Sequence, residues 1–163
     1  MNYILVRVDN RLVHGQILEA WLPFIGVAYI VVVDDEVAMD FFRETVIKMA
    51  VPREIELNVY GLEDFTQVLA AENEKVDTKK ALVLFSTIQS ALRSYQSGFR
   101  FRKLNIGNVY NDDAKLRCAA SIQLSEQDIA DIRILIDMGV EVECRCVPKD
   151  KPLDMKEFLM ENR

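Results

Sequence analysis

Short runs of apolar, β-branched residues alternate with amphipathic stretches along this chain of 163 residues, and this alternation constrains the fold more than any other feature. Residues 28–33 (AYIVVV) and 81–85 (ALVLF) are apolar or aromatic throughout, which is typical of central strands in a parallel sheet that helices cover on both faces. The stretches between the runs have the periodicity of helices, about 3.6 residues. The predicted strands are residues 3–6, 28–33, 55–60, 81–85, 103–106, 121–124 and 140–147.

Strands that alternate with helices predict an α/β domain with a mostly parallel central sheet. We expect about seven strands, helices on both faces and an antiparallel strand at an edge. Residues 140–147 alternate apolar and polar side chains, which suits an edge strand with one face in water. No repeat, low-complexity tract or linker divides the sequence, so residues 1–163 are expected to form a single domain.

Helix signals are clear in the second quarter of the chain. Asp34 and Asp35 precede a long helical stretch that ends at Pro52, and they are interpreted as helix-capping acids rather than catalysts. Aromatic residues at helical positions are expected in the core or on partly covered surface: Trp21, Phe24 and Phe41.

The charge balance excludes one large class of partner. Twenty Lys and Arg against 26 Asp and Glu give a net charge of −6, without a basic block. Because phosphate neutralisation supplies most of the affinity for nucleic acid, no nucleic-acid partner is expected. No apolar run reaches the roughly 20 residues of a membrane span. The first residues, 1–7, lack the pattern of a signal peptide.

The cysteines indicate a reducing, cytoplasmic setting. Cys118, Cys144 and Cys146 make an odd count without a CxxC pair, and Cys144 and Cys146 are interpreted as small core residues on one face of a strand. With a single histidine and no second cysteine pair, a zinc site is not expected.

That histidine, His14, lies where chemistry is expected. It falls within residues 7–16 (RVDNRLVHGQ), between the first strand and a helical stretch at 17–22. In open α/β sheets, ligands bind outside the carboxyl ends of the strands. A neutral imidazole keeps a lone pair on one ring nitrogen and can act as a nucleophile.

The neighbours of His14 suit a transferred phosphoryl group. Free N–H groups and the positive end of a helix stabilise an anion, and Arg11 adds a cation of fork geometry. Asp9 can orient the ring by accepting its other N–H, and Gly15 lets another group approach the backbone. The competing interpretation is an exposed Asp9–Arg11 ion pair beside a purely structural His14.

Four further residues are expected near the same rim. Gln16 either lines a phosphate pocket or faces solvent. Ser86 and Thr87 follow the strand at 81–85, where they either reach a phosphate beside His14 or cap the next helix. Gly107, after the strand at 103–106, is expected to serve a tight turn.

Residues 7–16 closely resemble the active-site segment of a known family, the IIB component of the mannose/fructose/sorbose class of the bacterial phosphoenolpyruvate-dependent sugar phosphotransferase system. The resemblance continues through residues 32–40, Pro52, residues 105–108 and residues 139–142, and so covers nearly the full chain.

The resemblance implies a phosphotransferase enzyme of sugar transport with a predominantly parallel sheet flanked by helices. His14 would accept phosphate on Nδ1 from the phosphohistidine of a IIA partner and donate it to a sugar held by membrane IIC and IID partners. Arg11 matches the family's phosphate-site arginine. No metal or organic cofactor is implied, and the protein would be cytoplasmic, associated with the inner face of the membrane through IIC and IID.

The chain departs from the family pattern after the predicted strand at 103–106. Where the family has a second glycine and a methionine, this sequence has Asn108, Val109 and Tyr110, followed later by Arg117. These positions suggest an alternative, a regulatory phosphoryl carrier without sugar transfer. A receiver-like signalling module and a binding relic that passes no phosphate are further alternatives, whereas the absence of GxGxxG and Walker motifs disfavours nucleotide sites.

Overall fold

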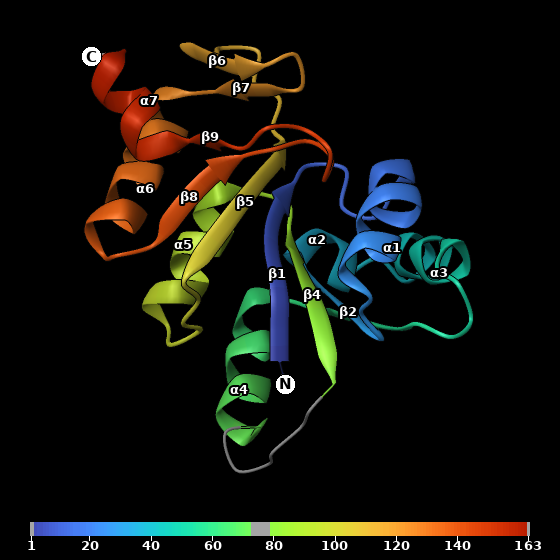
Figure 1. Ribbon diagram of the computed structural model, residues 1–163. Coiled ribbons are helices and arrows are strands. Elements are labelled where there is room, and N and C mark those ends of the chain that lie inside the picture. The colour runs from blue at the N-terminus through green and yellow to red at the C-terminus, as the bar shows by residue number, and fades with distance from the viewer. Residues whose placement is uncertain (1, 73–78, 163) are drawn as a thin grey trace.

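The centre of the molecule is a seven-stranded sheet in the order β3-β2-β4-β1-β5-β8-β9 (Figure 1). The computed structural model describes residues 2–72 and 79–162. Neighbouring strands pair in parallel except β9, which runs antiparallel to β8 at the edge. The predicted sheet type is therefore confirmed. The strands are β1 (Asn2–Asp9), β2 (Tyr29–Val33), β3 (Glu56–Tyr60), β4 (Lys80–Phe85), β5 (Lys103–Asn108), β8 (Glu141–Cys144) and β9 (Leu153–Asp154).

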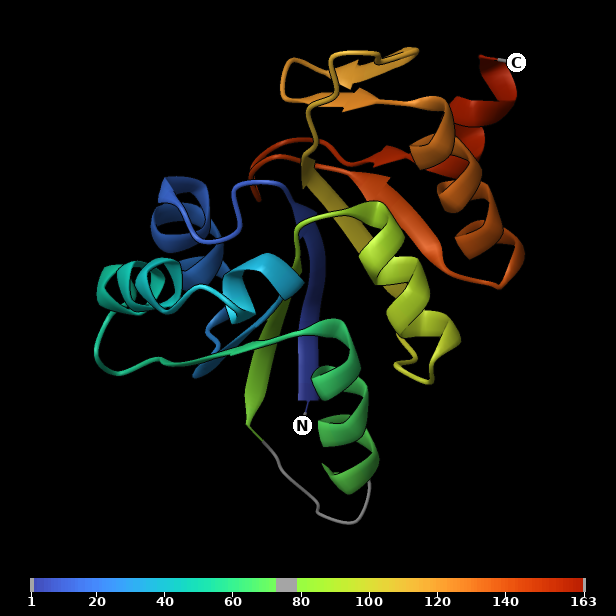
Figure 2. The same cartoon turned by 180° about the vertical axis from the view of Figure 1, so that it is seen from behind.

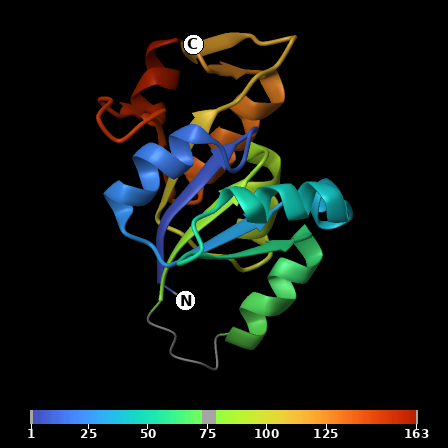
Figure 3. The ribbon, with the colours of Figure 1, turned by 90° about the vertical axis from the view of Figure 1, so that its right-hand side faces the viewer.

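Helices cover both faces of this sheet. On one face lie η1 (Gln16–Trp21), a π-helix, its continuation α1 (Leu22–Ile25), α2 (Asp35–Ala38) and α3 (Phe41–Ala50), which Figure 3 shows together. On the other face lie α4 (Leu62–Glu72), α5 (Ile88–Gln96), α6 (Glu126–Asp137) and α7 (Met155–Glu161); Figure 2 shows α4, α5 and α6 in front of the sheet. Within the described residues, no helix is long and apolar enough to span a bilayer.

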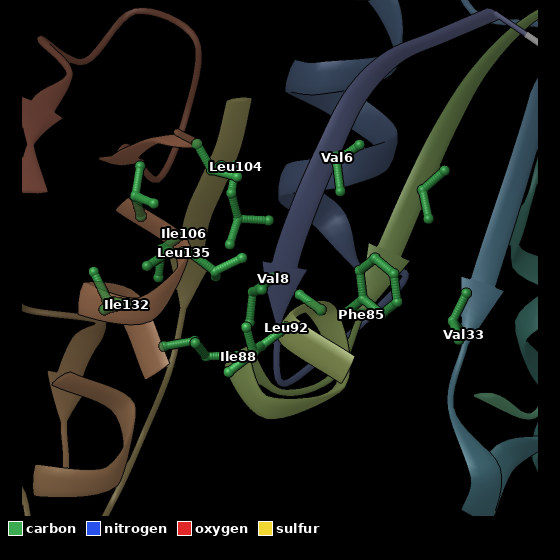
Figure 4. Close-up of a cluster of buried hydrophobic side chains, with 14 of the residues drawn as sticks. Val6, Val8, Val33, Phe85, Ile88, Leu92, Leu104, Ile106, Ile132 and Leu135 are labelled. Carbon is green, nitrogen blue, oxygen red and sulfur yellow. The ribbon is translucent and has the colours of Figure 1, made fainter. Parts of the chain in front are cut away.

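The two-residue alternation of the strands sorts side chains between two cores. In β1, Val6 and Val8 point into the core beneath α4 to α7, together with Leu104 and Ile106 of β5 (Figure 4). The intervening residues of β1 and β5 therefore face η1 and α1. That side of the two strands carries a buried polar strip, which includes Arg7, Asp9 and Asn105.

Two expected strands take different places. Residues 140–147 were expected at an edge, but β8 lies between β5 and β9, and the chain leaves the sheet after Cys144. Residues 121–124 were expected in the central sheet, but β7 (Ile122–Leu124) pairs antiparallel with β6 (Leu116–Ala119) as a separate hairpin. One bridge, between Val109 and Ile122, connects that hairpin to the chain beyond β5.

The helix expected between Asp34 and Pro52 is broken in two. Asp34 caps α2 by accepting from Val37 N, and Asp40 starts a second helix by accepting from Phe42 N and Arg43 N. Asp35 accepts from Leu62 N at the start of α4, so both acids cap helices, as predicted. The aromatic prediction holds for buried Trp21 and is wrong for Phe24 and Phe41, which are 63% and 83% exposed.

All three cysteines are free thiols. Cys144 is buried against Met155, as predicted for a small core residue. Cys146 lies beyond the end of β8 and is only half-buried, because the chain has left the sheet there.

Candidate active site

The candidate site is the turn between the end of β1 and the start of η1, where the upper ends of β1, β4 and β5 converge in Figure 1. Asn10 joins these strand ends: its Nδ2 donates to Ser86 O at 2.6 Å, its backbone N to Asn108 O at 2.8 Å, and its Oδ1 accepts from Tyr110 N at 2.6 Å. Leu12, buried at 4% exposure, has a left-handed φ of 57°. An apolar residue in this region is strained, so packing of Leu12 in the core sets the path of the loop.

Asp9 is the centre of the site, and neither it nor Arg7 is exposed to solvent. Its Oδ2 accepts from His14 Nε2 at 2.8 Å, Asn108 Nδ2 at 2.8 Å and Arg7 Nη2 at 3.0 Å. Its Oδ1 accepts from Arg11 N at 3.0 Å. We call Arg7, Asp9, His14 and Asn108 the Asp9 cluster.

Arg7 lies in a cage of fixed acceptors. Its Nη1 donates to Asn105 Oδ1 at 2.6 Å and to Arg145 O at 2.9 Å, and its Nη2 to Cys146 O at 3.1 Å. A Cβ on Gly107 would lie 1.8 Å from Arg7 Nη2. Gly107 is thus required inside β5 by the guanidinium that crosses it, and the prediction that it serves a tight turn is wrong.

The surroundings of Asp9 favour its ionised form. Burial of Asp9 opposes ionisation, but the His14 hydrogen bond, the positive charge of Arg7 and the Asn108 amide together outweigh it and lower the pKa of Asp9. Burial likewise lowers the pKa of Arg7, while the carboxylate of Asp9 opposes that change. At neutral pH the carboxylate is therefore ionised and only accepts hydrogen bonds.

That carboxylate decides which nitrogen of His14 carries the proton. Nε2 lies 2.8 Å from Asp9 Oδ2, so a proton on Nε2 makes a hydrogen bond, whereas a lone pair there would face an anion. The neutral ring consequently keeps its lone pair on Nδ1. Nδ1 is buried and has no hydrogen-bond partner among the residues that the structure describes, and the His14 side chain as a whole is 8% exposed.

The comparisons with known proteins assign this architecture to a family. The family described as PTS system sorbose subfamily IIB component matches residues 3–163. The chain belongs to this family. The fructose-specific EIIB component of Bacillus subtilis (strain 168) is 28% identical over 98% of this chain and 96% of its own length. The sorbose-specific EIIB component of Lacticaseibacillus casei is 30% identical, over 93% and 91%.

The solved structures agree with this assignment. The IIBSor domain of the sorbose permease from Klebsiella pneumoniae has a TM-score of 0.90 and 27% identity, covering 100% of this chain and 99% of its own. The resemblance noted in the sequence is thus confirmed, and the protein is a IIB component of the sugar phosphotransferase system.

In this IIB component the loop residues predicted for the site are more open than the cluster. Arg11 and Gly15 are exposed, and a Cβ on Gly15 would meet nothing within 4 Å. Within residues 2–72 and 79–162, the Arg11 guanidinium makes no ion pair. The alternative of an exposed Asp9–Arg11 pair is wrong, because Asp9 pairs with Arg7. Gln16 does not simply face solvent: its Oε1 accepts from Asn108 Nδ2 at 2.9 Å.

Ser86 and Thr87, the two hydroxyl residues after β4, lie at the same rim, and both stabilise the local structure. Thr87 Oγ1 accepts from Ser90 N at 3.1 Å and caps α5, which is the capping alternative of the sequence analysis. Ser86 contributes its backbone carbonyl to Asn10.

Sequence reasoning missed Arg7 and Asn10, and it did not assign a role to Asn108. A signal for Arg7 was present: a charged residue at an inward position of β1 needs a buried partner, and Asp9 lies two residues on, on the same face. Asn10 and Asn108 gave no comparable signal, since amides are frequent in loops and at strand ends.

Proposed function

We propose that this IIB component carries a phosphoryl group on His14, which it accepts from a IIA phosphocarrier and passes to a sugar bound by membrane IIC and IID partners. The observation that carries the proposal is the Asp9–His14 contact, because it leaves the lone pair on Nδ1. The proposal places the protein in the cytoplasm, held at the inner face of the membrane by IIC and IID.

In the first step, the Nδ1 lone pair attacks phosphorus, and the bond between phosphorus and the donor's histidine nitrogen breaks. In the second step, a sugar hydroxyl oxygen attacks phosphorus, the P–Nδ1 bond breaks with its electron pair returning to Nδ1, and the hydroxyl proton passes to water. Phosphoryl transfer requires mainly positioning and neutralisation of charge. Arg7 neutralises Asp9, which leaves Arg11 as the loop's cation for the phosphoryl oxygens.

Access to Nδ1 requires a rearrangement on docking, because this atom is buried in the unphosphorylated protein. The exposed Gly15 beside the ring suits the approach of a phosphoryl donor, because glycine has no side chain that could block the donor. Gln16 and the backbone at the start of η1 border the same place, and no side chain in the described part of the protein caps the N-terminus of η1. Ser86 and Thr87 both lie at this rim, and of the two only Ser86 is proposed as a neighbour of the phosphoryl group.

The names of relatives support the partners but do not select a sugar. The mannose-specific EIIAB component of Escherichia coli (strain K12) is 28% identical, and this chain spans 47% of its length; by its name, it joins IIA and IIB in one component. Relatives named for fructose, sorbose and N-acetylgalactosamine are 28%, 30% and 29% identical. Their similar identities leave the sugar open among them.

The test is transfer of labelled phosphate from a phosphorylated IIA component. The wild-type protein should take up acid-labile, base-stable phosphate on one residue, and His14→Ala should take up none. The matched control is Thr87→Ala, which removes a nearby hydroxyl and should still be labelled. Stable incorporation by His14→Ala would refute the assignment, and circular dichroism establishes that each variant is folded.

A further inference from the structure

The side chain of Asn108 reaches back from the end of β5 into the site. It is 8% exposed, and its amide nitrogen donates to Asp9 Oδ2 at 2.8 Å and to Gln16 Oε1 at 2.9 Å. These two bonds use both amide hydrogens. The same nitrogen lies 3.4 Å from His14 Nε2, so the amide also packs against the ring.

The negative charge of Asp9 determines which group donates and which accepts in the hydrogen bonds between Asp9 and Asn108 and between Asn108 and Gln16. Because the carboxylate only accepts, Asn108 must turn its NH2 group, and not its oxygen, toward Asp9. Its second hydrogen then needs an acceptor, so Gln16 must turn its carbonyl oxygen toward Asn108. The remaining polar group of Gln16 is its NH2, which has no hydrogen bond to any residue in the described part of the chain.

We propose that Asn108 is a positioning residue that fixes the Gln16 amide so that its NH2 group donates to an oxygen of the phosphoryl group on His14. This inference rests on the proposed function. Gln16 is two residues from His14 and begins η1, and phosphoryl oxygens are pure acceptors. Without the Asn108 side chain, the Gln16 amide can rotate and present its carbonyl oxygen, which repels the phosphoryl group.

Two variants and their combination test this coupling. Phosphoramidate is the phosphoryl donor, because it needs no protein partner: Nδ1 attacks phosphorus, the P–N bond breaks and ammonia leaves. Gln16→Ala should slow labelling of His14 about 10-fold or more, the effect of losing a hydrogen bond to a charged group. Asn108→Gly should slow it about 3- to 10-fold.

The double variant should be no slower than Gln16→Ala alone, because Asn108 acts through Gln16. Multiplicative losses would overturn the inference. The matched control is Asn111→Ala, since the Asn111 amide bonds Gln123 O and Asp128 Oδ2 instead; its labelling rate should equal that of the wild type.

A spectroscopic measurement separates this inference from the proposed function. In unphosphorylated, ¹⁵N-labelled protein, the Gln16 side-chain NH2 should be ordered in the wild type and lose order in Asn108→Gly. Asn108→Ser serves the same purpose if the glycine variant does not fold. An equally ordered Gln16 amide in both proteins overturns the inference, whatever the rates. An ordered amide in a wild-type protein that takes no phosphate from phosphoramidate or from IIA refutes the proposed function and the phosphoryl contact of Gln16, while the positioning of Gln16 by Asn108 stands.

Discussion

The last residues of β1 and the loop that follows them differ sharply, although they form one site. Arg7 and Asp9 are unexposed, and their charged groups are held by strands β1 and β5 and by the segment after β8. Arg11 and Gly15, a few residues on, are exposed. The difference teaches that the buried half sets the tautomer of the ring, while the exposed half is the part that meets a phosphoryl group and a partner in the proposed function. His14 lies at the boundary.

The largest effect is expected from a methyl group added to the buried half. Gly107→Ala should lower the free energy of unfolding by about 3–5 kcal/mol, the range for disrupting a buried ion pair, because its Cβ would overlap the Arg7 guanidinium. Gly15→Ala adds the same methyl group where nothing lies within 4 Å and should change stability by a few tenths of a kcal/mol. Urea denaturation of both variants measures the contrast, which equal losses would contradict.

Acid should weaken the buried half more gradually. The pKa of Asp9 is lowered in the folded protein, so its contribution to stability is complete above its unfolded pKa of about 3.9 and is lost as pH falls through the lower folded value. Urea denaturation between pH 6 and pH 2 should therefore show a steeper loss in the wild type than in Asp9→Asn. Parallel curves would mean that Asp9 does not contribute to acid unfolding.

A change in the exposed half should affect transfer and not folding. Arg11→Ala should slow phosphoryl transfer from IIA about 10- to 100-fold, through loss of a charge-assisted hydrogen bond, with stability unchanged within about 0.5 kcal/mol. Arg102→Ala is the matched control, because Arg102 is an exposed arginine that precedes the first residue of β5, whereas the site lies at the last residues of that strand. Wild-type rates in Arg11→Ala would remove Arg11 from the phosphate site.

The smallest effect is expected at the rim beside β4. Thr87→Ala should cost about 1 kcal/mol of stability through loss of the α5 cap, and transfer should continue at the wild-type rate. Thermal denaturation and the IIA assay measure the two quantities. Slow transfer with unchanged stability would show instead that the Thr87 hydroxyl serves the phosphate.

The sequence predicted the parallel sheet because β2 and β4 are buried on both faces, a state that only continuous apolar runs satisfy. It failed at β8, where Glu143 belongs to an alternating pattern and yet is 6% exposed. Ion pairing with Lys103 at 2.6 Å allows that carboxylate to be buried in an interior strand. A pattern of polarity does not reveal such a partner.

The sequence placed the candidate site after the first strand because a lone histidine follows that strand and precedes a helix, and the structure brings His14, Asp9 and Gln16 together there. The sequence did not identify the buried cation, because Arg7 and Arg11 are chemically alike and each lies two positions from Asp9. The strand alternation separates them: Arg7 is on the strand and shares a face with Asp9, whereas Arg11 is beyond it. Contacts from Asn108 cross 99 positions of the chain, and no local pattern predicts them.

The acceptors that hold Arg7 also order the steps of synthesis. The carbonyl of Arg145 lies 138 positions after Arg7 in the chain, and that of Cys146 lies 139 positions after it. A ribosome therefore releases His14 long before it makes the carbonyl groups that anchor the Arg7 guanidinium. Contacts of such sequence separation require closure of a long loop at an entropic cost, so a nascent chain cannot complete the acceptors around Arg7 until residues 145 and 146 have been made.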